Sequence, residues 1–334
     1  MALDPSIRQR LTLPAICAPM FRISNPALVR EACKSGIVGA LPSHNAKDFA
    51  MFEAWLDEIS EGLRVYADEN PGARIGPIAV NLSRMAGDAM TKHLDLCAKH
   101  GVEIIISAMG DPSELIARVH DWGGKVFHDV TNFRFAEKAI EAKVDGLTCI
   151  GSGGGGHSGL ISHIAFIPKV RAMFDGTIIM AGCISTGATI RAAEILGADL
   201  AYLGTRFIAT QEANAPDAYK AMLVSSAAKD LIFTPQVAGG AANWLKPSLV
   251  RVGIDPDNLP VTPPGAIRPE LPEGAVPWKT IWSAGQGVEL IDDVPSVAEL
   301  VTRLRREYVV ACDAPSFADV ARLVDQALDA KSAD

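Results

Sequence analysis

The residues best suited to chemistry are His157 and the run of glycines that precedes it, in the stretch LTCIGSGGGGHSG at residues 147–159. An imidazole changes its charge near neutral pH, so His157 is a candidate general acid or base. Glycines lack a β-carbon, and the backbone of residues 151–156 can therefore approach a flat or anionic ligand. The apolar residues 147–150 predict a buried strand. The stretch therefore predicts a ligand-binding loop that follows a strand, although a plain flexible loop is the alternative.

The same glycines match the GxGxxG pattern of dinucleotide-binding units through Gly151, Gly153 and Gly156. Such a unit begins a helix inside the motif and carries an acidic residue at the end of the next strand. Here residues 157–159 delay the helix, and the next predicted strand, at residues 177–181, ends without an acid. We therefore reject a dinucleotide-binding unit.

The elements that must position this loop are apolar strands that alternate with helices. The predicted strands cover residues 15–18, 38–41, 78–82, 103–107, 125–128, 147–150, 178–181 and 200–203. The predicted helices cover residues 25–34, 49–68, 88–99, 132–142 and 186–196, with another from residue 112. Strict alternation implies parallel strands joined by right-handed crossovers, and eight such units predict a (β/α)8 barrel, also called a TIM barrel.

In such a barrel the chemistry lies at the C-terminal ends of the strands. Those ends carry polar and glycine residues: Met20, residues 42–45, Asn81, Ser107, His128, the glycine loop, Gly182 and Gly204. Glycines after the seventh and eighth strands favour a phosphate site, because backbone N–H groups there can approach an anion. The alternative is that Gly182 and Gly204 only terminate their strands.

The regular pattern stops near Asp230. Nine of the 21 prolines lie between Leu231 and Gly285, a density that excludes long helices and central strands. Tryptophans in the same segment predict that it packs on the barrel rather than forming a free linker. We predict a barrel at residues 1–230, a packed proline-rich insertion at residues 231–290, and C-terminal helices at residues 291–334, formed by residues 297–311 and 316–330.

Composition narrows the partners. The chain has 334 residues, is 49% hydrophobic and carries a net charge of −8, which argues against nucleic acid and anionic membranes as partners. It contains no apolar run of membrane-spanning length, and its first residues lack the core of a signal peptide. The six cysteines and seven histidines have neither disulfide-framework nor metal-site spacing. We expect a cytoplasmic protein without a metal.

The chain resembles the nitronate monooxygenase family, also called 2-nitropropane dioxygenases, which are barrels that bind flavin mononucleotide (FMN). The segments that carry the resemblance are Ala18-Pro19-Met20, Val80-Asn81-Leu82, Gly155-Gly156-His157-Ser158-Gly159, Met180-Ala181-Gly182 and Leu203-Gly204-Thr205-Arg206-Phe207. Residues 235–247 and 282–287 are also similar to the family. The resemblance covers nearly the whole chain.

The resemblance implies a role for each of these segments. Ala18, Pro19 and Met20 would lie against the flavin ring, and Asn81 would hydrogen-bond the ring or the ribityl chain. Gly155 and Gly156 would let the flavin approach the loop. The phosphate would be held by Gly182, Cys183, Gly204 and Thr205. His157 matches the family's catalytic base, which takes the proton α to the nitro group.

Three departures leave the substrate open. Ile150 and Gly153 stand where many members have glutamine and glutamate, Asp129 stands where some relatives have lysine, and Cys183 stands where the phosphate loop usually has glycine. We expect FMN-dependent oxidation of a small nitronate or nitroalkane by O2. The alternatives are an FMN-dependent NAD(P)H reductase acting on a quinone or an enoyl thioester, and a non-catalytic flavin-binding barrel.

Two further histidines lie on the same face of the predicted barrel. We expect His128, at the end of the fifth strand, to contact the flavin ring or phosphate; a hydrogen-bonded core role is the alternative. His44 is a weaker candidate for a substrate contact. The sequence leaves the oligomeric state open, with a homodimer as one of the alternatives. It also leaves open whether NADH or NADPH is used.

Overall fold

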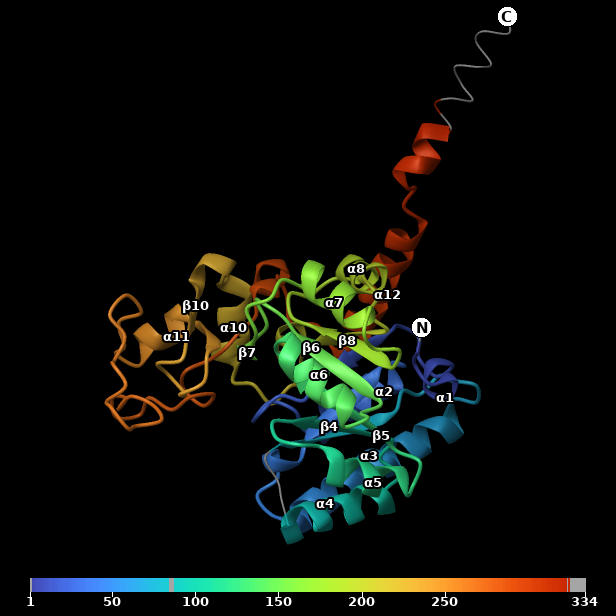
Figure 1. Cartoon of the computed structure of the whole chain (residues 1–334), viewed down its shortest axis with the longest axis horizontal. Coiled ribbons are helices and arrows are strands. Elements are labelled where there is room, and N and C mark those ends of the chain that lie inside the picture. The colour runs from blue at the N-terminus through green and yellow to red at the C-terminus, as the bar shows by residue number, and fades with distance from the viewer. Residues whose placement is uncertain (1, 84–86, 323, 325–334) are drawn as a thin grey trace, which may run out of the picture.

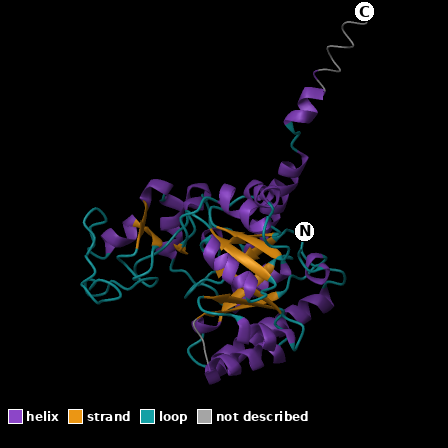
Figure 2. Ribbon diagram, viewed as in Figure 1, coloured by secondary structure: helices purple, strands orange, loops and turns teal. Residues whose placement is uncertain are grey.

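The computed structural model describes residues 2–83, 87–322 and 324, and its centre is a closed barrel of eight parallel strands. The alternation of strands and helices predicts this barrel, and the structure confirms it. In Figure 2 the strands lie at the centre with helices around them. The strands, in barrel order, are β1 (Ala15–Cys17), β2 (Val38–Pro42), β3 (Ile78–Ser83), β4 (Ile104–Ala108), β5 (Lys125–Val130), β6 (Gly146–Ile150), β8 (Thr177–Ala181) and β9 (Leu200–Leu203), which pairs back with β1.

Helices follow the strands and cover the barrel. They are α2 (Pro26–Lys34), α3 (Phe49–Glu69), α4 (Gly87–Lys99), α5 (Ser113–His120), α6 (Phe133–Glu141), α7 (His163–Arg171), α8 (Gly187–Leu196) and α12 (Val297–Asp313). Side-chain caps set several of their starts: Asn25 accepts a hydrogen bond from the Leu28 amide at 2.8 Å, and Pro26 occupies the first turn. The shorter helices are α1 (Pro5–Arg8), η1 (Ser43–Asn45), α9 (Thr205–Ile208), α10 (Asp217–Ser225), η2 (Ala228–Asp230), α11 (Lys246–Arg251) and η3 (Gln286–Leu290).

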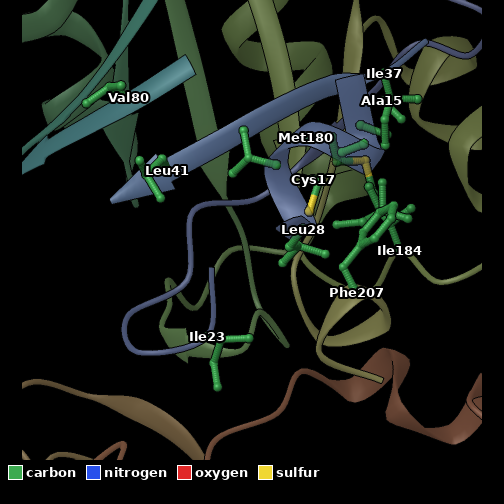
Figure 3. Close-up of a cluster of buried hydrophobic side chains, with 14 of the residues drawn as sticks. Ala15, Cys17, Ile23, Leu28, Ile37, Leu41, Val80, Met180, Ile184 and Phe207 are labelled. Atoms are coloured by element: carbon green, nitrogen blue, oxygen red, sulfur yellow. The ribbon is translucent and has the colours of Figure 1, made fainter. Parts of the chain in front are cut away.

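Strand side chains alternate between two apolar layers. One layer fills the inside of the barrel and includes Ile16, Ile106 and Phe127. Leu3 and Ile7 join this layer, so α1 closes the N-terminal end of the barrel. The other layer lies between strands and helices; Figure 3 shows Cys17, Met180, Ile184 and Phe207 in it. Because both faces are buried, the strands are apolar on both faces.

Strand β5 is longer than predicted, and the correction moves His128. Asp129 and Val130 continue the ladder opposite Thr148 and Cys149, so His128 lies inside the strand rather than at its end. Alternation then points His128 away from the barrel axis, because its neighbour Phe127 belongs to the inner layer. The residue that faces inward at the end of this strand is Asp129.

The proline-rich segment forms a small antiparallel sheet beside the barrel, at the left of Figure 1. Its order is β10 (Leu231–Thr234), β11 (Ala242–Leu245) and β7 (Gly156–His157), so β11 is a central strand. The expectation that this segment holds no central strand is therefore wrong. The reason is local: β11 lies in a stretch without proline between Pro235 and Pro247.

The segment has an apolar core of its own that includes Trp244 and Ile281. It is also joined to the barrel, because Trp282 stacks on Tyr219 of α10 with ring centroids 4.7 Å apart. Such packing agrees with the expectation that this segment is not a free linker. The domain boundaries at residues 230 and 290 stay a prediction.

Helix α12 packs against α8 and α2, which gives the barrel its last covering helix. Gly187 permits this contact, because a β-carbon there would collide with the backbone at Leu304 and Tyr308. The further helix predicted at residues 316–330 falls partly on residues 323 and 325–330, which lie outside the described residues. Residues 317–322 are helical.

Candidate functional site

A cavity of about 1360 Å³ opens at the C-terminal ends of the barrel strands. The sequence placed twelve candidate residues at this end, and the structure brings all of them to the wall of this one cavity. They are Ala18, Pro19, Met20, Asn81, His128, Gly155, Gly156, His157, Gly182, Cys183, Gly204 and Thr205. Their gathering follows from the barrel, because parallel strands deliver their C-terminal ends to one rim.

The floor of the cavity is a layer of polar side chains on top of the apolar barrel interior. Asn81, Asp129 and Tyr202 line the cavity and stand two residues beyond inner-layer positions of their strands. Thr148 lies opposite Asp129 in the β5–β6 ladder and is fully buried. The Asn81 amide donates to the Ile106 carbonyl at 3.3 Å. We call Asn81, Asp129, Thr148 and Tyr202 the polar floor.

The glycine loop after β6 is held from two sides. His163, the first residue of α7, donates from Nε2 to the Ala181 carbonyl at 2.8 Å, and its ring lies so close to Gly151 that a β-carbon there would come within 2.5 Å of Nε2. Asn243 of β11 donates from Nδ2 to the Gly154 carbonyl at 2.7 Å. The sequence analysis assigned neither residue a part in the site. The available signals were the likeness of residues 235–247 to the family and the position of His163 directly after the glycine motif.

His157 belongs to strand β7, because it pairs with Ala242 of β11. Its side chain is exposed at the cavity wall, and its ring centroid lies 5.3 Å from that of Trp278. Trp278 has a left-handed φ of 57°, a conformation that only surrounding contacts can maintain in a bulky residue. A β-carbon on Gly240 would come within 2.5 Å of His157 Nε2. The insertion therefore sets both the backbone and the ring of the candidate base.

The expected phosphate loop has an unusual backbone at its second residue. Gly182 has a φ of 117°, and Cys183 follows with a φ of 60°. A side chain in this left-handed region costs roughly 1–2 kcal/mol, a cost that glycine would not incur. The Cys183 Sγ lies 3.5 Å from the Ser152 carbonyl and contacts the Gln286 side chain at 3.8 Å. The thiol thus packs between the two loops.

Two glycines leave open space where a flavin is expected. A β-carbon on Gly204 would meet only Ala18 and Met20, each at 3.8 Å, and one on Gly156 would meet only the Trp278 Nε1 at 3.9 Å. Gly204 has a φ of −102°, a backbone conformation that any residue can adopt. The contribution of this glycine is therefore the space that its missing side chain leaves. Space at these glycines, together with the polar floor, fits a flat, polar-edged ring system such as a flavin.

Thr205 ties the eighth strand to the segment after the insertion. Its Oγ1 accepts a hydrogen bond from the Gly285 amide at 2.9 Å. A β-carbon on Gly155 would lie 3.0 Å from both of these atoms, so the glycine loop, Thr205 and Gly285 are in close contact. Gly285 is a site residue that the sequence analysis did not single out.

Two other histidines line the cavity: His128 is buried and His44 is exposed. A hydrogen bond of 2.8 Å joins the His128 Nδ1 to the Ser107 hydroxyl, and burial lowers the pKa of His128. Burial also lowers the pKa of His44, whose ring lies 5.2 Å from that of Phe21. His128 is therefore a hydrogen-bonded, buried side chain that also lines the cavity. Its contact with a flavin stays a prediction.

Asp129 is an acidic side chain of the cavity wall whose ionisation is changed by burial. Burial raises its pKa to about 7, and a weaker interaction with the Thr148 hydroxyl lowers it in part. The contact with Thr148 lacks hydrogen-bond geometry, because Asp129 Oδ1 and Thr148 Oγ1 are both buried without a partner among the described residues.

The described part of the chain shows no group of three or more His, Cys, Asp or Glu side chains arranged for a metal ion. Over the same residues, no helix combines the length and the apolar character needed to cross a membrane.

Comparison with known proteins places this geometry in context. The family model described as nitronate monooxygenase matches residues 9–307. A nitronate monooxygenase of Paraburkholderia phytofirmans is 28% identical over 344 residues, which cover 88% of this chain and 92% of that protein.

Two solved structures share the fold. A nitroalkane oxidase from Streptomyces ansochromogenes matches with a TM-score of 0.71 and 21% sequence identity. The match covers 92% of this chain and 98% of the oxidase chain. FabK from Thermotoga maritima matches with a TM-score of 0.69 and 20% sequence identity. The match covers 93% of this chain and 98% of the FabK chain.

Proposed function

The chain belongs to the nitronate monooxygenase family and is a flavin-dependent oxidoreductase, and we propose that it uses FMN to oxidise a nitronate or small nitroalkane with O2. The observation that carries this proposal is the position of His157. It is exposed at the wall of the same cavity that contains the open glycines and the polar floor. A base and a flat cofactor space thus share one compartment.

The proposed cofactor site uses the residues expected from the sequence. Ala18, Pro19 and Met20 would face the ring, and Asn81 would contribute an amide. His128, which lines the cavity, would contact the flavin. Gly155 and Gly156 would allow close approach of the loop, and Gly182, Cys183, Gly204 and Thr205 would hold the phosphate. The redox chemistry, acceptance of the substrate's electrons and their transfer to O2, would be supplied by FMN when bound.

His157 supplies the proton chemistry in this proposal. A nitroalkane must lose its α proton before oxidation, and an imidazole at the cavity wall can receive it at Nε2 or Nδ1. Trp278 and Gly240 hold the ring in one orientation, since Trp278 packs against it and Gly240 leaves it room. Pairing of β7 with β11 holds the backbone beneath it. The base is therefore positioned before the substrate arrives, which lowers the cost of orienting it.

The volume of the cavity favours a second candidate. At about 1360 Å³ it exceeds the usual range of roughly 300–1,000 Å³ for ligand pockets. Its wall also includes the exposed apolar side chains of Met109, Phe135 and Ile267. Such a site has room for FMN and a substrate larger than a nitroalkane. An FMN-dependent NAD(P)H reductase of quinones or enoyl thioesters is therefore the alternative.

Anaerobic mixing separates the two functions. Purified enzyme is mixed without oxygen with propionate 3-nitronate, with 2-nitropropane and with NADH or NADPH, and flavin absorbance is followed. We expect bleaching with the nitro compounds, and O2 consumption when air is admitted. Rapid bleaching by a nicotinamide, with no response to either nitro compound, would replace the proposal with the reductase.

A further inference from the structure

The polar floor contains one acidic side chain, Asp129, for which neither the fold nor the proposed reaction provides a use. It lies at the inward-facing end of β5 and lines the cavity. Its Oδ1 is buried and has no hydrogen-bond partner among the described residues, and the hydroxyl of Thr148 beside it is also unpartnered. Buried polar atoms normally have partners, so the Asp129 carboxyl group, whose side chain is half-buried at the cavity wall, has hydrogen-bonding capacity that no described residue uses.

The surroundings of Asp129 favour its uncharged form. Burial penalises the charged form of Asp129, for which no described residue supplies a compensating cation, and its pKa is raised to about 7. Tyr202, which faces it from β9, is also neutral, because burial and the Asp129 charge raise its pKa. Burial lowers the pKa of His128, which points to the other face of β5. Among the described residues, no charged neighbour contributes to the pKa shift of Asp129.

We propose that Asp129 is a cofactor-binding residue of this chain, a neutral carboxylic acid that donates a hydrogen bond from the cavity floor to the bound flavin. The inference rests on the proposed function, because it requires a flavin in this cavity. A carboxylic acid has one O–H donor, whereas a carboxylate has acceptors only. The carbonyl and nitrogen acceptors of a flavin ring can therefore be bound by the acid and not by the ion.

The proton on Asp129 thereby controls affinity for the cofactor. A carboxylate on the floor would lose its donor and would bring a negative charge towards a ring that gains electrons during turnover. The acid in this chain provides a donor only below its pKa, so the affinity for FMN falls as the pH rises.

The test measures the dissociation constant of FMN with cofactor-free enzyme by flavin fluorescence, between pH 5.5 and 8.5. The proteins are the native chain, Asp129→Asn and the control Asp111→Asn. An asparagine keeps a donor at every pH, so the ratio of the native to the Asp129→Asn dissociation constant should rise about tenfold between pH 6 and 8.5. The ratio cancels the titration of the FMN phosphate itself.

Asp111 is a matched control because it lines the same cavity but is exposed, and its hydrogen bonds with Ser113 lower its pKa. Its carboxylate is ionised throughout the pH range, so Asp111→Asn should follow the native pH profile. Should Asp129→Asn not fold, Thr148→Val provides a second route. Removing the hydroxyl that lowers the pKa of Asp129 should move the loss of FMN affinity to higher pH.

Two results would overturn the inference. One is a ratio of the FMN dissociation constants of the native chain and Asp129→Asn that does not change with pH. The other is a Thr148→Val variant whose FMN affinity depends on pH in the same way as that of the native chain. Both require measurable FMN binding and leave the proposed cofactor intact. A native chain that binds no FMN at any pH removes the proposed cofactor and this inference together, so the two failures are distinguishable.

Discussion

The ring of His157 lies directly against Gly240, with room for no atom between them: a β-carbon on Gly240 would stand 2.5 Å from Nε2 and 2.6 Å from Cδ2. The two residues come from different parts of the fold, a strand that extends the glycine loop and the loop before β11. The orientation of the candidate base therefore depends on the absence of a side chain in the insertion.

Gly240→Ala should displace the His157 ring while leaving the fold intact. The new methyl group meets the end of a flexible side chain, so the ring moves rather than the backbone. A displacement of about 1 Å can reduce catalysis by about 10²-fold, and we expect kcat/KM for 2-nitropropane to fall to this extent. FMN content and Tm should stay near native values. The control Gly274→Asn adds a side chain in open space within the insertion and should leave kcat/KM unchanged.

His157→Asn should affect two substrates differently. A nitroalkane must lose its α proton, whereas a nitronate has already lost it. General-base catalysis contributes about 10²–10⁴-fold, so kcat/KM for 2-nitropropane should fall by that factor and the value for the nitronate by much less. FMN should stay bound. Equal losses on both substrates would assign His157 to positioning. His93→Asn, at a half-buried histidine of α4 outside the cavity wall, serves as the control.

The cofactor should be FMN rather than FAD. The glycines after β8 and β9 are suited to a terminal phosphate, and no dinucleotide-binding motif is available for an adenosine half. Heat-denatured protein should release a yellow compound that comigrates with an FMN standard in equimolar amount. Recovery of FAD, or of no flavin at all, contradicts the assignment.

Gly204→Ala and Gly204→Val should lose FMN without loss of structure. The protein itself has room for the first new carbon, which would lie 3.8 Å from Ala18 and Met20, and the φ of −102° suits any residue. Loss of flavin would therefore report a bound group that fills this space. Flavin occupancy measures the loss of FMN, and the circular dichroism spectrum shows whether the structure is retained. Full occupancy in both variants means that the phosphate lies elsewhere.

The stability of the cofactor-free protein should depend on pH through Asp129. The folded state raises its pKa from 3.8 to about 7, so the folded protein holds a proton that the unfolded chain releases. The free energy of unfolding should fall as pH rises from about 4 to about 7, by up to about 4 kcal/mol. Partial exposure of the rest of the side chain to the cavity reduces this figure. Denaturant titrations of the native chain and Asp129→Asn should show a difference that grows with pH; a constant difference contradicts the shift.

The sequence by itself determined the barrel and twelve residues of the cavity wall. Hydrophobic periodicity and the residues that begin or end an element are local properties of the sequence. Apolar runs bounded by glycine indicate strands, and caps such as Asn25 followed by Pro26 indicate where helices begin. Once eight such units are recognised, the geometry of a parallel barrel brings Asn81, Gly182 and Gly204 to one rim. Their roles in cofactor binding stay a prediction, but their convergence followed from topology.

Only the tertiary structure decided how the side chains at that rim are held. Asn243 and His163 fasten the glycine loop, Gly240 leaves space for His157, and each contact joins segments that are distant in the chain. The raised pKa of Asp129 likewise depends on its burial in the closed barrel. Hydrogen-bond geometry and desolvation depend on which residues surround a group in space, and a linear pattern of residue types does not contain that information.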